Sequence, residues 1–324
     1  EIYTLSLHDA LPIWGVACRP VFGAAGAADA IVPHGAAGWC AGGPRIVRHP
    51  SWPASPGSGV GHDGWMDAAT RLVPLEGAFN FRDLGGYRGT GGREVRWGRL
   101  YRSDTLHELT PEDIGRLADL GLRTVVDLRT ERELARTGRG PLEHHDVAFH
   151  HLAVVKEGVA GEAGPAGAAD REAVAAPAPA GDDLAERYLW YLEVGGDALA
   201  EALTLLGSDE HYPLVFHCAA GKDRTGVLAA LVLDLCGVAR DDIVADYVIT
   251  AERMGFIMDR YRADPRFAER VASVPASRFS VEAPTMERFL DELAGRFGGA
   301  RGWARTAGVP DAALDALPEL LLAP

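Results

Sequence analysis

The sequence is poor in cysteine, has no excess of positive charge and contains no long apolar run. Four cysteines in 324 residues are too few for a disulfide framework, which suits a reducing cytoplasm. Lys and Arg total 32 against 46 Asp and Glu, a net charge of −14 that argues against binding to nucleic acid or an anionic membrane. No apolar run reaches the roughly 18 residues that a transmembrane helix needs. We therefore expect a cytoplasmic protein without stable membrane insertion, and we leave secretion open.

Methionine is missing from the N-terminal part of the chain, where the first one is Met66. Residues 17–64 are rich in Gly, Ala and Pro and show little helix or strand periodicity. Residues 1–13 resemble a translated sequencing-adapter peptide. A signal peptide is disfavoured because the start is not basic and His8 and Asp9 interrupt the apolar run. We predict that residues 1–65 are a non-native or disordered leader and that residues 66–324 form a single domain.

The most informative segment is His217–Gly226, with the sequence HCAAGKDRTG, which we call the cysteine loop. An apolar run precedes it and a helix-like run follows it, so the loop is predicted to join a strand to a helix N-terminus. Backbone N–H groups at such a terminus bind anions, and their field stabilises a thiolate nucleophile. Arg224 can contact two phosphate oxygens at once. The pattern predicts phosphoryl transfer through a phosphocysteine.

A structural cysteine, a nucleotide-binding loop and a metal site all fit the cysteine loop less well. A buried core cysteine does not account for Gly221 and the three charged residues that follow it. A nucleotide-binding P-loop has Ser or Thr after Gly-Lys, where this chain has Asp223. A zinc site needs a second cysteine close to Cys218, and none is there. A sulfur-transfer or arsenate-reducing enzyme on a similar loop is a further alternative. Arsenate reduction would need a resolving cysteine, for which Cys236 is poorly placed.

The cysteine loop resembles the signature of the cysteine-dependent tyrosine phosphatases, in the Lys-Asp form of bacterial members. Three more segments resemble motifs of that family: Asn80–Tyr87 (NFRDLGGY), Arg102–Asp104 (RSD) and Val125–Arg129 (VVDLR). The similarity runs from about residue 72 to the end of the chain. The resemblance implies a phosphomonoesterase with the fold of that family. We expect such an enzyme to act on phosphorylated protein, above all on phosphotyrosine, with a phosphoinositide phosphatase or a dual-specificity phosphatase as the alternative.

Within the cysteine loop, Cys218 is the predicted nucleophile. Arg224 and the backbone N–H groups are predicted to hold the phosphate oxygens. Thr225 is expected to donate to the sulfur or to cap the helix. A pseudoenzyme that only binds phosphate is the alternative of another class, and the intact Cys218 and Arg224 argue against it. The remaining residues expected to form the substrate site are His217, Ala219, Ala220, Gly221, Lys222 and Gly226.

Two aspartates compete for the role of general acid, which must protonate the leaving oxygen and then activate water. Asp223 lies in the cysteine loop, and the resemblance supports it. Asp127 ends a predicted strand, where it could approach Cys218 or simply pair with Arg129. We place Asp223 ahead. Lys222 is expected to face a second phosphate or an acidic flank, with a solvated lysine as the alternative.

The mechanism requires no cofactor and no metal. Four histidines could suggest a metal site, but adjacent residues point to opposite sides of a strand, and we expect these side chains at the surface. The aromatic run Tyr188–Leu192 is predicted to be core. Arg82 and Asp83 are predicted to form an ion pair at a strand edge, with bracing of the cysteine loop as the alternative. The four histidines are His144, His145, His150 and His151.

Alternating strand-like and helix-like segments predict a three-layer α/β/α fold with a central, mostly parallel sheet and a helical C-terminal part. Helices are expected to begin at Thr110 and Thr130, because each is followed three residues later by an acidic residue in the capping-box pattern. Residues 158–182, rich in Ala, Gly and Pro, are expected to be a flexible loop. The predicted strands cover about 96–102, 123–128, 147–155 and 213–217.

The helices expected between about Val248 and Ser280 are predicted to form a movable lid. This follows in part from the resemblance, because related bacterial phosphatases have a lid in this part of the chain. The segment also combines an apolar helix face, which includes Met254 and Tyr261, with three arginines. Pro265 is expected to end the first helix. Ordinary packing of a helical subdomain is the alternative.

Overall fold

The computed structural model describes residues 71–156, 178–179, 181, 183–265, 268, 272 and 275–324. The chain divides into two units, Glu1–Gly61 and His62–Pro324, and every described residue belongs to the second. The predicted leader and most of the predicted 158–182 loop fall outside the described residues. So do residues 266–267, 269–271 and 273–274 of the predicted lid. These remain predictions.

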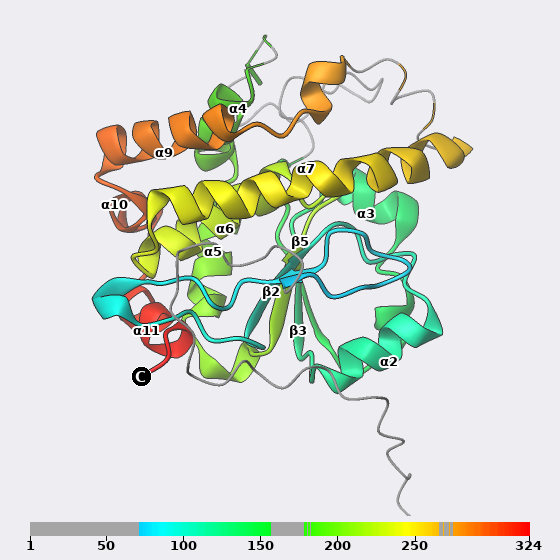
Figure 1. Cartoon of the computed structure of the whole chain (residues 1–324), viewed down its shortest axis with the longest axis horizontal. Helices are drawn as coiled ribbons and strands as arrows, with labels where there is room; N and C mark the ends of the chain where they lie inside the picture. The colour runs from blue at the N-terminus through cyan, green and yellow to red at the C-terminus, as the bar shows by residue number, and fades with distance from the viewer. Residues whose placement is uncertain are drawn as a thin grey trace, which may run out of the picture. The chain divides into compact units, whose positions relative to one another are not determined.

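A five-stranded sheet forms the centre of the second unit, in the order β1-β2-β5-β3-β4 (Figure 1). Only β1 pairs antiparallel, and β2, β5, β3 and β4 run parallel, which confirms the predicted mostly parallel sheet. The register places Ser103 and Asp127 on either side of His217, so three strands end at one level. The strands are β1 (Arg82–Asp83), β2 (Leu100–Ser103), β3 (Thr124–Asp127), β4 (Ala148–His151) and β5 (Leu214–His217).

Helices cover both faces of the sheet. Leu214 and Phe216 of β5 pack into one apolar core, and Val215, which points to the other face, packs into a second, as the two-residue period of a strand requires. Leu117 of α2 lies in the second core and Tyr188 of α4 in the first. The helices are α2 (Pro111–Asp119), α3 (Glu131–Thr137), α4 (Leu184–Val194), α5 (Gly196–Leu206), α6 (Asp223–Leu235), α7 (Arg240–Ala263), α9 (Ala283–Phe297), α10 (Ala300–Thr306) and α11 (Asp311–Leu321).

Both predicted capping boxes are present. The Asp113 backbone N–H donates to the Thr110 hydroxyl over 3.2 Å, and the Thr110 N–H donates to the Asp113 carboxylate over 3.0 Å. The matching distances at Thr130 and Glu133 are 3.1 and 2.8 Å. These local signals fix where α2 and α3 begin, and each helix follows the carboxyl end of a strand.

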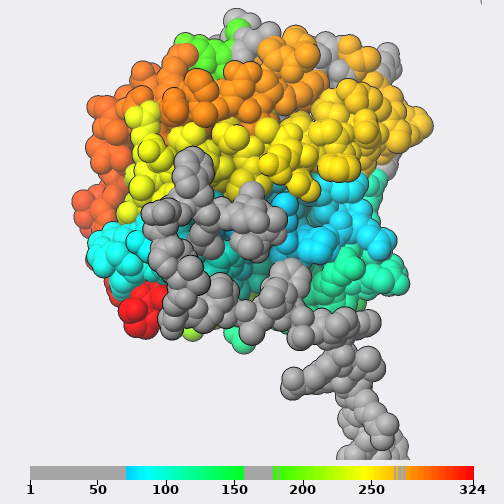
Figure 2. Space-filling model, in the orientation of Figure 1, coloured from blue at the N-terminus to red at the C-terminus, as the bar shows by residue number. Residues whose placement is uncertain are grey.

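Of the C-terminal helices, α7 and α9 pack against each other, whereas α10 also packs on α6 and α11 packs on α5 and α6. Figure 1 shows α7 passing above the strands, with α9 beside it. The C-terminal half of α7 lies at the surface against the segment that contains Phe79 (Figure 2). α7 ends at Ala263, shortly before Pro265, as predicted. None of the helices in the described residues combines the length and the apolar character that crossing a membrane requires.

Candidate active site

The cysteine loop joins β5 to α6, and Cys218 lies at its start with 2% of its surface exposed. A cavity of about 250 Å³ opens beside it. α3, α7 and the 3-10 helix η4 (Ala276–Phe279) also contribute to the cavity wall. Of the residues predicted for the site, the cavity wall contains Cys218, Ala219, Ala220, Lys222, Asp223 and Arg224. Those that lie buried behind it are Asp127, His217, Gly221, Thr225 and Gly226.

Gly221 lets the cysteine loop pass close to β2. Its φ is +64°, and a Cβ at this position would lie 2.5 Å from the carbonyl oxygen of Ser103. Only glycine tolerates both conditions. The Gly221 carbonyl accepts hydrogen bonds from Asn80 Nδ2 at 3.2 Å and from Arg102 at 2.8 Å. Two of the family-like motifs, NFRD and RSD, therefore hold the loop in shape.

A buried charge cluster stands behind these contacts. Arg82 contacts Asp246 of α7 over 3.0 Å, and Arg102 pairs with the same carboxylate. Burial opposes ionisation of Asp246, but the two arginines outweigh it and lower its pKa to about 2. The predicted ion pair of Arg82 with Asp83 is wrong, because Asp83 instead accepts the backbone N–H groups of two glycines, Gly85 and Gly98. The cluster connects α7 to the cysteine loop through Arg102.

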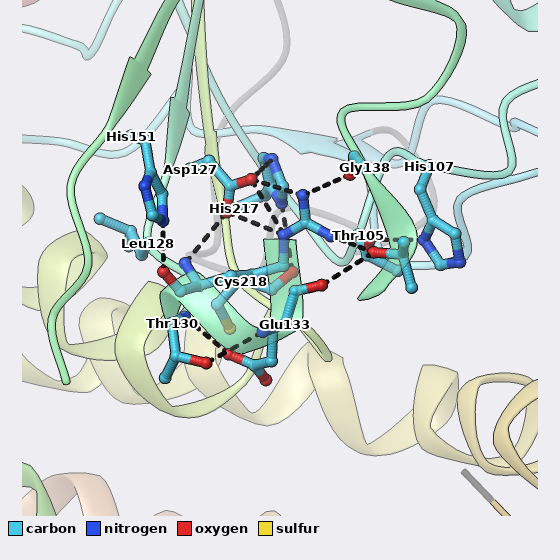
Figure 3. A network of polar contacts seen from close by, with 12 residues as sticks. Thr105, His107, Asp127, Leu128, Thr130, Glu133, Gly138, His151, His217 and Cys218 are labelled. Atoms are coloured by element: carbon cyan, nitrogen blue, oxygen red, sulfur yellow. Dashed lines mark hydrogen bonds and ion pairs between the residues drawn. The ribbon is translucent and has the colours of Figure 1, made fainter. Parts of the chain in front are cut away.

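Arg224 is held from α3. Its two terminal nitrogens contact the two carboxylate oxygens of Glu133 over 2.6 and 3.0 Å. Burial opposes ionisation of Glu133, but Arg224 outweighs it and lowers the Glu133 pKa to about 2. The same carboxylate closes the capping box with Thr130 (Figure 3). Glu133 therefore fixes the guanidinium from a position that the start of a helix determines.

Asp127 is buried in an ion pair. Its carboxylate accepts from Arg129 Nε at 2.9 Å and from the Arg129 backbone N–H at 3.0 Å, and it lies 3.7 Å from His217 Nε2 (Figure 3). Burial opposes ionisation, but His217 and Arg129 outweigh it and lower the Asp127 pKa to about 2. Burial also lowers the pKa of His217, whose Nδ1 lies 3.2 Å from the Cys218 carbonyl oxygen. Asp127, paired with Arg129, therefore supports the end of β5 from behind the cavity wall.

Asp223 faces the cavity from the first turn of α6. The Tyr188 hydroxyl donates to its Oδ1 over 2.8 Å, and Lys222 Nζ lies 3.3 Å from the same oxygen. Unlike Asp127, Asp223 is in direct reach of whatever occupies the cavity beside Cys218.

Lys222 is not the solvated lysine considered as an alternative, because only 1% of its surface is exposed. Its ammonium group donates to the carbonyl oxygens of Arg278 and Ser280 over 2.5 and 3.1 Å. The cysteine loop is thus tied to the η4 segment, which borders the cavity. The predicted contact of Lys222 with substrate stays a prediction.

The Thr225 hydroxyl is fully buried and makes no hydrogen bond to any part of the chain that the structure describes. The predicted helix-capping bond is therefore absent from this structure. Gly226, one residue further on, lies against the ring of Tyr247, because a Cβ there would be 3.2 Å from a ring carbon. Its small size lets α7 pack close to the start of α6.

Sequence reasoning did not assign a role in the site to Glu133, Tyr188 or Asn80. Glu133 was visible only as part of a capping box, and Tyr188 only as an aromatic core residue. Asn80 lies in a motif singled out by resemblance, which is the one signal that could have located it. Each of these side chains reaches the cysteine loop from a distant part of the sequence.

Comparison with known proteins gives consistent matches. The model of a family described as "Tyrosine phosphatase family" matches residues 73–323. The triple specificity protein phosphatase PtpB of Mycobacterium tuberculosis is 30% identical over 285 residues, covering 76% of this chain and 98% of that protein. A putative tyrosine-protein phosphatase of Cupriavidus necator is 40% identical over 181 residues, covering 54% of this chain and 61% of that protein. A tyrosine-protein phosphatase of Nostoc commune is 27% identical over 222 residues, covering 65% of this chain and 69% of that protein.

Proposed function

Because this chain belongs to the tyrosine phosphatase family, we propose that it hydrolyses phosphate monoesters through a phosphocysteine on Cys218, with protein phosphotyrosine as its preferred substrate. The observation that carries the proposal is the placement of Cys218, Asp223 and Arg224 around one cavity. These are a nucleophile, a proton donor and a fixed positive charge.

In the first step the Cys218 thiolate attacks phosphorus, and the bond from phosphorus to the ester oxygen breaks with its electron pair on that oxygen. Asp223 gives its proton to the departing oxygen. Arg224 and the loop N–H groups hold the equatorial oxygens, where charge is concentrated in the transition state. Glu133 supports this step by keeping the guanidinium in one orientation.

In the second step water attacks the phosphocysteine. The Asp223 carboxylate accepts a proton from that water, the sulfur–phosphorus bond breaks, and inorganic phosphate and the Cys218 thiolate are released. Thr225 can assist the departing thiolate, because its buried hydroxyl has a hydrogen to donate. His217 supports the loop from behind through the Cys218 carbonyl.

Asp223 is favoured over Asp127 as the acid by its position, and the charges around Asp127 argue against that residue. Asp223 lines the cavity, whereas Asp127 is buried and engaged with Arg129. A carboxyl group with a pKa of about 2, as at Asp127, holds almost no proton to donate near neutral pH. Asp127 instead supports the loop through the ion pair.

The preference for phosphotyrosine rests on the apolar part of the cavity wall. Met254, Tyr261 and Phe279 line the cavity together with Cys218. An aryl ring attached to the phosphate would bury apolar surface against these side chains, and a short alkyl chain would bury less.

Broader specificity is the second candidate. The relative from Mycobacterium tuberculosis is named a triple specificity phosphatase, and Arg136 and Arg278 line the cavity as well. Cations beyond the catalytic arginine suit substrates that carry more than one phosphate, including phosphoinositides.

A substrate panel with the full chain tests the proposal. Initial rates are compared for a phosphotyrosine peptide, the matching phosphoserine and phosphothreonine peptides, and a short-chain phosphoinositide. We expect the highest kcat/KM for phosphotyrosine. Faster turnover of the phosphoinositide would establish the second candidate, and no turnover of any substrate would refute the proposed reaction.

A further inference from the structure

We propose that Tyr188 is a positioning residue for the reaction, and that its hydroxyl holds the Asp223 carboxyl group in the orientation needed to protonate the leaving oxygen. The inference rests on the proposed role of Asp223 as general acid. The sequence marks Tyr188 only as core, and its position on α4 places it 35 residues before the aspartate.

Three side chains from three helices form one line of hydrogen bonds. The Tyr188 hydroxyl of α4 donates to Asp223 Oδ1 of α6 over 2.8 Å. The Tyr247 hydroxyl of α7 lies 2.8 Å from the Tyr188 hydroxyl. Tyr188 donates its only hydroxyl hydrogen to Asp223. In the contact between the two tyrosines, Tyr247 must therefore be the donor and Tyr188 the acceptor.

Both phenols keep their protons. Burial and the nearby Asp223 carboxylate raise the pKa of Tyr188 and of Tyr247 well above the ordinary range. Tyr247 therefore donates to Tyr188, and Tyr188 to Asp223, across the whole pH range in which a phosphatase works. Asp223 receives one donated hydrogen bond at Oδ1 whether its other oxygen is protonated or not.

Packing fixes Tyr188 tightly. None of its surface is exposed. Its ring is stacked on Tyr191 at a centroid distance of 6.2 Å, and the rings of Tyr247 and Phe289 meet it edge-on at 6.1 and 6.0 Å. A donor on such a rigid ring sets the direction of its acceptor with little freedom.

The alternative partner of Asp223 shows why positioning matters. Lys222 Nζ lies 3.3 Å from the same Oδ1. If the Tyr188 hydroxyl were removed, this ammonium group would be the remaining charged partner of Oδ1 and would alone set the orientation of the carboxylate. With Tyr188 in place, Oδ1 is engaged and Oδ2 is left to carry the proton toward the cavity. Small displacements of a proton donor lower rates considerably.

The test compares Tyr188→Phe with wild type and with Asp223→Asn, on aryl phosphates whose leaving groups range from good to poor. An acid matters most when the departing oxygen is basic. We expect Tyr188→Phe to lower kcat/KM about 10- to 100-fold for the poorest leaving group and far less for the best. The double variant should be no slower than Asp223→Asn alone, because the two changes disable one function.

Tyr212→Phe is the matched control. Tyr212 is also a buried tyrosine, and its hydroxyl donates to the Leu206 carbonyl over 2.6 Å, outside the cavity wall. The Tyr212→Phe variant loses a hydrogen bond comparable to the one that Tyr188→Phe loses, but away from the cavity. Its leaving-group dependence should therefore equal that of wild type, even if its melting temperature falls. A uniform rate loss in Tyr188→Phe, like that of a merely weakened fold, would overturn the inference.

The outcomes separate this inference from the proposed function. If Asp223→Asn leaves the leaving-group dependence unchanged, the assignment of the acid fails and the inference fails with it. If Asp223→Asn steepens the dependence and Tyr188→Phe does not, only the inference fails. Should Tyr188→Phe not fold, Tyr247→Phe removes the outer hydrogen bond alone. We expect a smaller steepening there, of about 2- to 5-fold, and an unchanged slope would overturn the inference.

Discussion

At the scale of single residues, the proposed reaction depends on the ionised sulfur of Cys218. Serine is nearly isosteric, but its hydroxyl is not ionised near neutral pH, while the surrounding N–H groups and Arg224 remain. We predict that Cys218→Ser lowers kcat by at least about 10⁴-fold and still binds inorganic phosphate. Rates with 4-nitrophenyl phosphate and phosphate titration by calorimetry measure the two effects. Substantial residual turnover would rule out a phosphocysteine.

Asp127 provides a second prediction at the residue scale. Asp127→Asn leaves the buried Arg129 without its charged partner, so we expect a loss of about 3–5 kcal/mol in the free energy of unfolding. The dependence of kcat/KM on the leaving group should not change, because Asp127 lies outside the cavity wall. A steeper dependence in this variant would make Asp127 the acid.

The stability effect of Asp127 depends on pH in a defined direction. Its pKa falls from an ordinary value of 3.8 to about 2 in the folded protein. A carboxyl group with a depressed folded pKa stabilises the fold above its unfolded pKa, and this contribution is lost as the pH falls toward the folded value. Urea unfolding of wild type and Asp127→Asn should therefore differ most above about pH 4 and converge toward pH 2.

At the scale of elements, the first turn of α3 contains a residue that serves both the helix and the site. Glu133 closes the capping box with Thr130 and also holds Arg224. We predict that Glu133→Gln lowers kcat/KM about 10- to 100-fold, because a neutral amide cannot keep both guanidinium contacts. Asp113→Asn is the matched control, since Asp113 closes the equivalent capping box of α2 outside the cavity wall. Because the Asp113 carboxylate also accepts the backbone N–H groups of Glu76 and Gly77, the change should cost more than the roughly 1 kcal/mol of a lost cap and leave kcat/KM unchanged.

The second element is the helical cover formed by the C-terminal half of α7 and by η4. Met254, Ile257 and Met258 pack into a small apolar cluster with Phe79 and Phe279. Arg260 pairs with the buried Asp104 over 2.7 Å, and Lys222 holds two carbonyls of the η4 segment. The cover is therefore attached at several points, and the predicted movement requires these contacts to open.

Hydrogen exchange measures that movement. We predict that exchange in 248–263 and 275–280 slows when vanadate or phosphate binds, because a ligand beside Cys218 would favour the closed arrangement. Exchange in α5, which lies apart from the cavity wall, serves as the internal reference. If the cover exchanges slowly and the ligand leaves it unchanged, the cover is fixed packing and the lid hypothesis is wrong.

At the scale of the whole molecule, the family match spans residues 73–323, and every residue of the cavity wall lies within that span. We predict that a chain beginning at Met66 has the melting temperature and kcat/KM of the full chain. Differential scanning calorimetry and steady-state kinetics on the two proteins compare them directly. A clear loss of either quantity would show that residues 1–65 take part in the fold.

The sequence alone determined the strand–loop–helix order, the beginnings of α2 and α3, and the position of the cysteine loop in that order. These features depend on local signals: alternating apolar residues that a strand buries, an oxygen that caps a helix start, and a loop whose residue types fit one chemistry. Cys218, Arg224 and the mostly parallel sheet were predicted from such signals. The reach of each signal is a few residues, which is why element boundaries and types could be predicted but partners could not.

Only the tertiary structure decided which side chains meet the cysteine loop. Glu133 approaches Arg224 from 91 residues away, Tyr188 approaches Asp223 from 35, and the carbonyls that hold Lys222 lie 56 and 58 residues further along the chain. No local pattern encodes such pairs, because they depend on how helices pack across both faces of the sheet. Packing likewise buried Asp127 and left Asp223 at the cavity. The two aspartates, which the sequence could not fully separate, therefore differ in access to the cavity and in the charged groups around them.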